Sequence, residues 1–108
     1  MRAAPMPKTV RVGPHAYSVL LTAAAQMPKT QGRPDCGTCR FDSLQILVKK
    51  RQRRTKQQET LLHEVLHSCT YPNLIGKKVT DEDFVETTAP LLLQVLKDNP
   101  KLLAYLTQ

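Results

Sequence analysis

The sequence predicts an α+β fold in which a small β-sheet packs against amphipathic helices. Two observations indicate this class: short segments rich in branched residues occupy the first half of the chain, and apolar residues recur at helical spacing in the second half. With 108 residues, the chain has room for one domain with a single modest core. The chain contains no Trp and only two Phe, so this core is expected to be aliphatic.

Strands are expected in the first half of the chain. Residues 1–8 are rich in Pro and Ala and predict a flexible N-terminus, so the single domain is expected to span residues 9–108. Gly13 and Pro14 form a turn dipeptide between two apolar segments. Residues 26–37 contain two Pro and two Gly and predict a loop. The expected strands are residues 9–13, 16–22 and 44–49.

The first helix is expected over residues 55–69, where apolar residues recur at intervals of three and four. Pro72 lies in the segment that is expected to end this helix. The residues predicted to share its core-facing stripe are Leu61, Leu62, Val65, Leu66 and Cys69.

Two further helices are expected near the C-terminus. Thr80 is a good N-cap, and Asp83 three residues later completes a pattern similar to a capping box. Pro90 lies inside this second helix, so a kink or break is expected there. Pro100 follows Asn99 and predicts the start of a short last helix. The residues expected to line the inner face of the second helix are Val85, Thr88, Leu92 and Leu96.

The first helix contains the sequence HEVLH, which is the HExxH pattern of a metal site. His63 and His67 lie four residues apart, so they project from one side of the helix and can reach one tetrahedral zinc ion. Glu64 lies beside that metal and can accept a proton from water whose pKa the metal has lowered. Both histidines fall beside the apolar stripe, so we expect them to face a cleft. The alternative is that they are surface residues without a metal.

Zinc requires a third protein ligand, and the acidic start of the second helix is its expected source. Glu82 is the first choice because it lies at the edge of the inner face, followed by Glu86 and then Asp81. Glu86 can alternatively hydrogen-bond a residue that binds the metal. The acidic cluster is also explained by favourable charge at a helix N-terminus. His15 is disfavoured because it lies in a predicted hairpin turn far upstream.

Three segments of the second half share a pattern with known proteins: ETLLHEVLHSC, DEDFVE and LLQVLKDNPKLLAYL. Residues 55–106, which contain them, resemble the small HExxH zinc metallopeptidase-like proteins of bacteriophage genomes, which are related to the ImmA/IrrE peptidases of the zincin group. The resemblance implies a minimal zincin-like fold, in which a short sheet packs beside a helix pair that carries two His ligands and a downstream Glu. It also implies Zn²⁺ as the cofactor, held by His63, His67 and Glu82.

The resemblance covers about half of the chain, and the first half matches only in outline. Two features depart from the family pattern: the pair Cys36 and Cys39, and a dense basic block after the last predicted strand. Three cysteines are an odd number, which argues against a disulfide framework. Half of a zinc knuckle is one explanation for the pair, and two reduced thiols in a turn are the simpler one.

These features predict a zinc-dependent hydrolase, with a metallopeptidase acting on a protein or peptide as the expected activity. Glu64 is the expected catalytic general base. An alternative function is a nucleic-acid-associated protein, or a phage structural or assembly protein that retains a vestigial zinc site. The net charge of +7 favours weak nucleic-acid contact, and a solvated loop is the simpler explanation of the basic block. The residues of this block are Lys49, Lys50, Arg51, Arg53 and Arg54.

No run of about 18 apolar residues is present, so neither a membrane span nor a membrane partner is expected. The apolar segment after residue 18 is short and lies too far from the N-terminus for a secretory signal. The expected location is therefore the cytoplasm, which would be that of the host cell if a phage encodes the protein.

Overall fold

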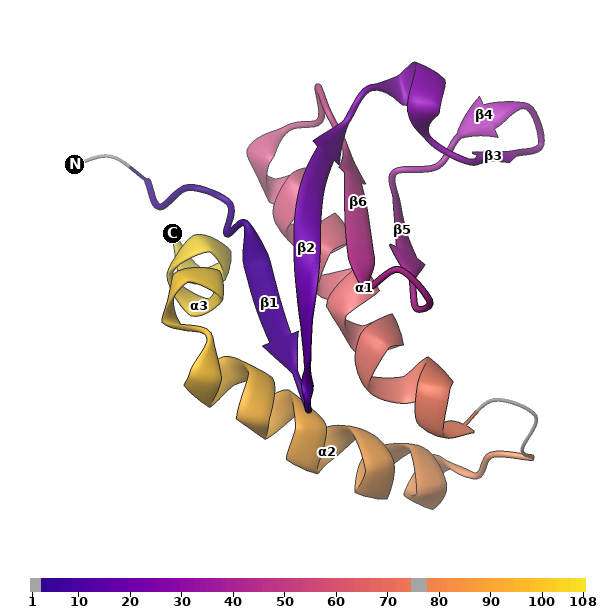
Figure 1. Ribbon diagram of the computed structural model, residues 1–108, viewed down its shortest axis with the longest axis vertical. Coiled ribbons are helices and arrows are strands. Elements are labelled where there is room, and N and C mark those ends of the chain that lie inside the picture. Colours follow the sequence, from indigo (N-terminus) through magenta and orange to yellow (C-terminus); the bar gives the residue numbers. More distant parts are fainter. Residues whose placement is uncertain (1–2, 75–77) are drawn as a thin grey trace.

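The computed structural model describes residues 3–74 and 78–108 and confirms the predicted α+β class. A four-stranded sheet packs against α1, while α2 runs across one end of the sheet and α3 lies beside the N-terminal segment (Figure 1). A separate two-stranded ribbon is formed by β3 and β4. The elements are β1 (Thr9–Val12), β2 (His15–Thr22), η1 (Ala24–Gln26), β3 (Lys29–Thr30), β4 (Arg33–Pro34), β5 (Gly37–Arg40), β6 (Gln45–Lys49), α1 (Arg54–Leu74), α2 (Asp81–Asp98) and α3 (Pro100–Thr107).

The sheet has the strand order β1-β2-β6-β5, so β5 lies at one edge. β1 and β2 form an antiparallel hairpin, and Gly13 in its turn has a φ of +57°, a conformation that glycine adopts without a Cβ penalty. β2 and β6 pair in parallel with Val19 opposite Ile46, and β5 pairs antiparallel to β6 with Cys39 opposite Ile46. Since directly paired residues share a face of the sheet, Val19, Ile46 and Cys39 point to the same side.

The three predicted strands are all present, and the structure adds strands that the sequence did not indicate. Residues 26–37, expected to be a loop, contain the short ribbon of β3 and β4, whose turn residues Gln31 and Gly32 both have positive φ. β5 has the sequence GTCR, which has neither apolar alternation nor branched aliphatic residues. It is a strand because it pairs with β6, which is a property of the tertiary structure.

The core lies between α1 and the inner face of the sheet. Leu61, Val65 and Cys69 are fully buried, as the predicted stripe requires. Leu62 is 37% exposed, so it does not belong to that stripe, and the buried face of α1 instead includes Glu64 at 6% exposure. The sheet contributes Val10, Val12, Tyr17, Val19, Ile46 and Val48 to this core.

Both prolines expected to interrupt helices are accommodated within them. α1 continues through Pro72 to Leu74, so the predicted end of this helix is wrong. Pro72 lies in the last turn, where its missing N–H removes a single backbone hydrogen bond. α2 is continuous through Pro90, so no break occurs there either.

The start of α2 confirms the predicted cap and corrects its inner face. The Thr80 hydroxyl accepts a hydrogen bond from the Asp83 N–H, and the Asp83 carboxylate accepts one from the Thr80 N–H. Thr88 is buried as predicted, but Val85 is 54% exposed. The first turns of α2 lie beyond the sheet, beside the end of α1 (Figure 1), which explains this exposure.

Residues 3–8 run alongside α3 and make defined contacts. The guanidinium of Arg54 donates to the Ala4 carbonyl at 2.7 Å, and Met6 packs against the core. Residues 1 and 2 lie outside the described part of the chain, so the flexibility predicted for residues 1–8 stays a prediction. No helix among the described residues is long and apolar enough to cross a membrane.

Candidate metal centre

The α1 helix places the two motif histidines one turn apart on its exposed side. The Nε2 atoms of His63 and His67 are 3.1 Å apart, and their rings meet edge to face with centroids 4.7 Å apart. Two nitrogens that bind one tetrahedral zinc ion lie about 3.3 Å from each other, given Zn–N bonds of about 2.0–2.1 Å. The spacing of the two imidazole nitrogens therefore fits a shared metal ion.

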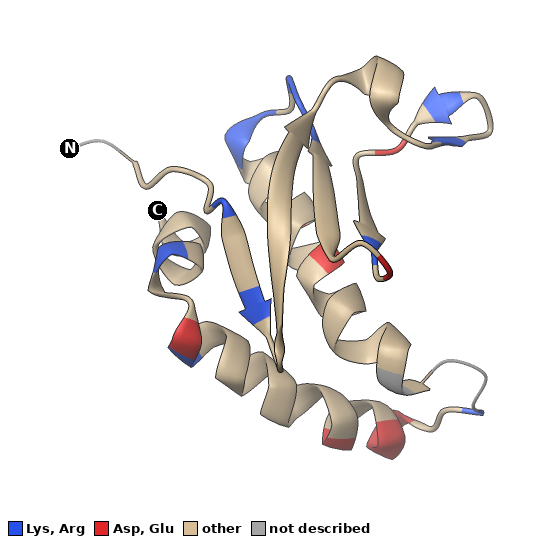
Figure 2. Ribbon diagram, viewed as in Figure 1, with Lys and Arg blue, Asp and Glu red and all other residues tan. Residues whose placement is uncertain are grey.

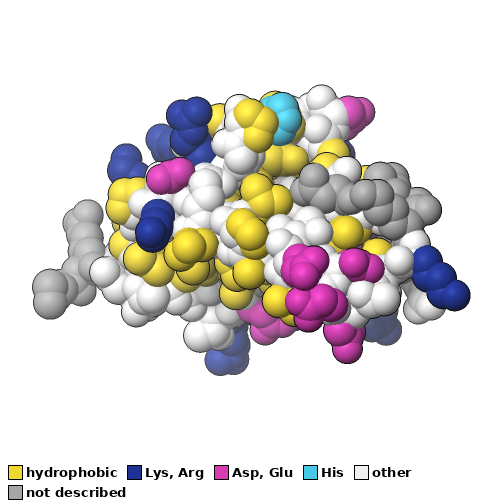
Figure 3. Space-filling view, turned by 90° about the horizontal axis from the view of Figure 1, so that it is seen from below, with side chains coloured by type: hydrophobic (Ala, Val, Ile, Leu, Met, Phe, Trp, Pro, Cys, Tyr) yellow, Lys and Arg dark blue, Asp and Glu magenta, His cyan; other side chains and the backbone are white. Residues whose placement is uncertain are grey.

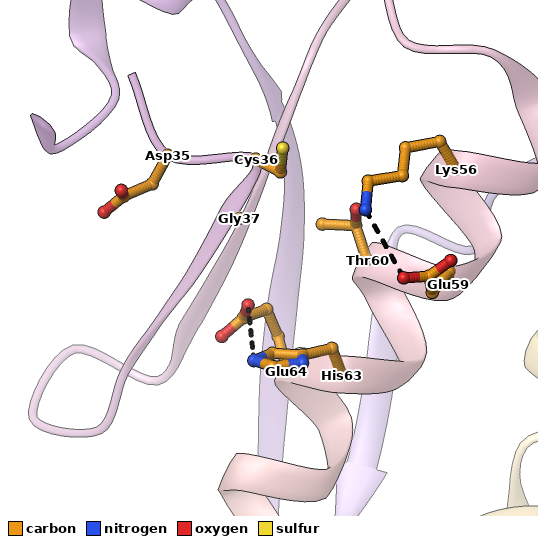
Figure 4. Close-up of a pocket in the computed structure, with 8 residues that line it drawn as sticks. All are labelled: Asp35, Cys36, Gly37, Lys56, Glu59, Thr60, His63 and Glu64. Atoms are coloured by element: carbon orange, nitrogen blue, oxygen red, sulfur yellow. Dashed lines mark hydrogen bonds and ion pairs between the residues drawn. The ribbon is translucent and has the colours of Figure 1, made fainter. Parts of the chain in front are cut away.

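Glu64 extends from the same helix turn toward the sheet and is almost completely buried. Its Oε2 lies 4.0 Å from the Nε2 of His63, as Figure 4 shows. The ligand atoms of His63, Glu64 and His67 all lie within 4.8 Å of one another. We call these three residues the metal centre. The two imidazoles are donors that suit zinc, and the Glu64 carboxylate lies beside them.

The edge strand β5 contacts the metal centre through a residue that has no side chain. A Cβ atom at Gly37 would lie 2.5 Å from Cγ2 of Thr60 and 3.1 Å from Oε2 of Glu64. Gly37 therefore allows the β5 backbone to approach α1 closely. Cys39, two residues further along β5, faces the same side, so β5 covers Glu64 from the sheet side.

Burial sets the protonation preferences of the centre. It raises the pKa of the Glu64 carboxyl, an effect that nearby His63 opposes and Asp35 reinforces. It also lowers the pKa of His67, with a further contribution from His63, which favours the neutral imidazole that binds metals. Burial and the charge of Glu64 raise the pKa of Cys39 to about 12, so this thiol is protonated at neutral pH.

Two hollows open on either side of the metal centre, and both are lined by Gly37, His63 and Glu64. One, of about 330 Å³, extends toward the start of α1. The other, of about 320 Å³, extends toward the end of α1 and also reaches His67. Figure 4 shows His63 and Glu64 directed into the first hollow, between α1 and β5. The two hollows make the metal centre accessible to ligands from solvent.

The structure does not bring the expected third ligand to the metal centre. Glu82 is exposed in the first turn of α2 and is not part of the group around the histidines. Glu86 and Asp81 are exposed as well, and the disfavoured His15 is exposed at the start of β2. Figure 3 shows acidic side chains gathered on the face that contains the start of α2. Glu82 stays a predicted ligand that lies outside the group around the histidines in the structure.

The cysteine pair does not form a separate site. Cys36 and Cys39 form no disulfide, and both are half-buried. Cys36 lines the first hollow and Cys39 the second. Sequence reasoning treated this pair as a turn and missed that Gly37, between them, lies against the metal centre. The Gly in the Cys-Gly-Thr-Cys segment was the one available signal, because a glycine within a strand often marks a close backbone approach.

Comparisons with models of protein families, with curated proteins and with solved structures found no match to this chain. The resemblance to the HExxH metallopeptidase-like proteins stays a prediction.

Proposed function

We propose that the chain is a zinc-dependent hydrolase that cleaves peptide bonds at the metal centre. The observation that carries this proposal is the 3.1 Å separation of the His63 and His67 Nε2 atoms beside the buried carboxylate of Glu64. Burying a carboxylate costs stability, so buried carboxylates in clefts are typical of functional sites. This one opens onto two hollows next to a pair of potential metal ligands. The cytoplasmic location expected from the sequence is part of this proposal.

Each residue of the centre has a distinct task in the proposed reaction. His63 and His67 would hold the ion, and Zn²⁺ bound there would polarise the substrate carbonyl and lower the pKa of water. Glu64 accepts a proton from the attacking water and passes it to the nitrogen of the leaving amine. Its raised pKa suits this task, because a general base works best when its pKa approaches the working pH.

The sheet edge beside the centre offers a place for the substrate backbone. Among the described strands, β6 is the partner of β5, and the other edge of β5 pairs with no strand. An extended peptide can bind such an edge through main-chain hydrogen bonds. Because Gly37 lies against Glu64, a peptide on this edge would pass close to the metal centre.

A single substitution separates catalysis from metal binding. Glu64→Gln keeps the shape of the side chain but removes its basicity, so peptide cleavage by the zinc-loaded protein should fall at least about 100-fold. Zinc content should stay the same if the two histidines hold the ion. Cleavage is measured by mass spectrometry on a mixture of unstructured peptides. Asp98→Asn is the control, because Asp98 is an exposed carboxylate at the end of α2 that lines neither hollow.

Two results would contradict the proposal. One is cleavage that persists unchanged in the Glu64→Gln protein. The other is a wild-type protein that contains zinc and cleaves none of the peptides. The second result, together with an intact phage function in the Glu64→Gln variant, would favour a structural or assembly role with a vestigial site.

A second candidate function is binding to nucleic acid, and the distribution of charge favours it. Figure 2 shows Lys and Arg gathered at the end of the molecule formed by the β6–α1 connection and the ribbon of β3 and β4. Arg54 does not belong to this surface, since its guanidinium donates to Ala4 and lies 4.8 Å from the ring centroid of Tyr105. The basic residues of the β3–β4 ribbon join the rest of the basic block at this end of the molecule. We call this group the basic end; its members are Lys29, Arg33, Lys49, Lys50, Arg51 and Arg53.

The location of these charges, as opposed to their number, can be tested with two variants of equal net charge. The first replaces four exposed residues of the basic end by Gln, and the second replaces four exposed basic residues elsewhere. If the basic end binds duplex DNA, only the first variant should lose affinity. The wild-type plot of log K against log salt concentration should have a slope of roughly −4, which corresponds to about four phosphate contacts. The substituted residues are Arg33, Lys50, Arg51 and Arg53 in the first variant and Lys8, Arg11, Lys97 and Lys101 in the second.

Equal loss of affinity in the two variants would show that net charge alone attracts the DNA. Wild-type protein that fails to bind at low salt would remove nucleic acid from the candidate partners altogether.

A further inference from the structure

Two aromatic side chains from different elements stack at the rim of the metal centre. Phe41 lies in the β5–β6 connection and Tyr71 near the end of α1, and their ring centroids are 4.5 Å apart with planes 17° from parallel. The pair lines the same hollow as His63, Glu64 and His67. Tyr71 is 45% exposed, and neither ring belongs to the apolar core.

The two hollows beside the metal centre therefore differ in chemistry. The hollow toward the start of α1 is lined by charged and polar side chains, including Asp35, Lys56 and Glu59, as Figure 4 shows. Lys56 and Glu59 form an ion pair at 3.3 Å on its helix side. The hollow toward the end of α1 has the rings of Phe41 and Tyr71 instead. A ligand that spans the centre would meet a polar wall on one side and an aromatic wall on the other.

The position of the stack distinguishes it from the other exposed apolar residues of the chain. Leu93 and Phe84, for example, are exposed on α2 and line neither hollow. The stack joins the end of the motif helix to the connection that follows the edge strand, so both flanks of the centre contribute to it. The outer faces and edges of the two stacked rings remain available as apolar surface, and an apolar group placed against them is removed from water.

We propose that Phe41 and Tyr71 form a subsite for an apolar side chain, aromatic or long aliphatic, of the peptide bound at the metal centre. The subsite lies on the His67 side, and the polar hollow on the other side accepts the neighbouring part of the substrate. This proposal rests on the proposed function, since it assigns the substrate class of the same site. The enzyme would then select substrates by one large apolar residue next to the cleaved bond.

The test measures binding to the zinc-loaded protein by calorimetry and requires no turnover. The probes are acetohydroxamate, which binds metal without a side chain, and the hydroxamates of N-acetyl-phenylalanine, N-acetyl-alanine and N-acetyl-aspartate. The phenylalanine probe should bind about tenfold more tightly than the alanine probe, as expected if roughly 55 Å² of apolar surface leaves water. The aspartate probe should bind least tightly, because it places a charge against the rings.

Substitutions of Phe41 and Tyr71 test whether these two rings cause the tighter binding of the phenylalanine probe. Phe41→Ala with Tyr71→Ala should bring the phenylalanine probe to the affinity of the alanine probe and leave acetohydroxamate binding unchanged. Phe84→Ala is the matched control, because Phe84 is also an aromatic residue at 45% exposure, and it should keep the tenfold preference. Circular dichroism checks that each variant is folded. If the double variant does not fold, Tyr71→Ala alone replaces it and should lose at least threefold of the preference.

The failures of the two proposals are distinguishable. If acetohydroxamate and all other probes fail to bind the zinc-loaded wild type, the proposed metal centre itself is wrong. If acetohydroxamate binds but the phenylalanine and alanine probes bind equally, the aromatic subsite is wrong and the hydrolase proposal stands. A preference that survives removal of both rings also overturns the subsite.

Discussion

At Gly37 the backbone of β5 lies against the side chains of Thr60 and Glu64 on α1. Any Cβ atom here would come within 2.5 Å of Cγ2 of Thr60, closer than two carbon atoms can approach without one of them moving. Oε2 of Glu64 is also only 3.1 Å from that position. A side chain at residue 37 would therefore displace the carboxylate as well as Thr60. The absence of a single methyl group thus sets both the packing of the edge strand and the position of the proposed general base.

Gly37→Ala is therefore expected to lower the free energy of unfolding by about 1–3 kcal/mol, the usual cost of overpacking. Peptide cleavage should fall more than zinc content, because Glu64 moves while the histidines stay in place. Adding Thr60→Ser, which removes Cγ2, should restore most of the stability. Urea unfolding of the single and double variants checks this, with Thr60→Ser alone as the control. A Gly37→Ala protein with wild-type stability would show that β5 is not packed as closely as described.

The buried carboxyl of Glu64 makes the stability of the metal-free protein depend on pH. Its pKa is raised on folding, so its contribution to stability is fully present below the unfolded pKa, about 4.3, and is lost as pH rises through the folded pKa. The metal-free protein is therefore less stable at neutral pH than it would be without this pKa shift. Glu64→Gln should melt a few degrees higher than wild type at pH 7, and the difference should vanish near pH 4. Equal melting temperatures at pH 7, measured with a chelator present, would contradict this.

Among the elements, the junction of α2 and α3 is fixed to the outer edge of β1 by the buried amide of Asn99, and Gln94 one turn earlier on α2 also hydrogen-bonds Arg11 and Gly13. The Asn99 Oδ1 accepts from the Arg11 N–H at 2.8 Å, and its Nδ2 donates to the carbonyls of Arg11 and Val95 at 2.9 and 2.8 Å. Asn99 occupies the N-cap position of α3 but makes no capping hydrogen bond there. The side chain instead hydrogen-bonds the backbone of β1, and so attaches the junction of the two C-terminal helices to the sheet.

Asn99→Ala removes all three hydrogen bonds and leaves the Arg11 N–H of β1 without its partner, while the Arg11 carbonyl keeps the hydrogen bond from Gln94 Nε2 at 3.2 Å. The expected loss is about 2–4 kcal/mol in the free energy of unfolding, since buried groups that lose a partner cost more than the bond itself gains. The free energy of unfolding of Asn99→Asp should lie between those of wild type and Asn99→Ala, because a carboxylate can still accept from the Arg11 N–H but cannot donate. Denaturant unfolding measures the series. An alanine variant as stable as wild type would mean that this junction does not hold the helices.

The elements with strong local signals were predictable from the sequence, and those that depend on pairing were not. The capping pair Thr80 and Asp83 and the periodic residues of α1 specify their helices locally, and both are present. β5 has no strand signal in its residues, since it exists through pairing with β6. Val85 satisfies the helical period but is exposed, because periodicity does not show how far a helix extends beyond the sheet it covers. Pro72 is tolerated because it lies in a terminal turn.

The candidate site divides in the same way. The spacing of His63 and His67 is a property of one helix, so the sequence alone predicts that their side chains meet. The roles of Gly37, Phe41 and Tyr71 arise only when the edge strand and its connection pack beside that helix. The prediction of Glu82 as a ligand rests on its position on a helix wheel, which cannot specify how two helices are oriented relative to each other.

In the whole molecule, the metal centre lies between an edge strand and a helix of a fold with only two layers. One layer is the sheet and the other is α1, and among the described residues no third layer lies over the hollows beside the histidines (Figure 1). The basic end and the acidic start of α2 lie at opposite ends of the molecule (Figure 2). In the two proposed functions, a peptide would therefore bind at a different part of the surface from a nucleic acid.

The central claim is that His63 and His67 together hold a zinc ion. Metal analysis of protein purified without added zinc, for wild type and for His67→Ala, tests it most directly. His15→Ala serves as the control for the loss of an exposed histidine. The expected result is about one zinc per chain in the wild type and the control, and at least a tenfold loss of zinc affinity in His67→Ala. Wild-type protein that contains no zinc and takes none up, or zinc that remains fully bound in His67→Ala, would contradict the claim.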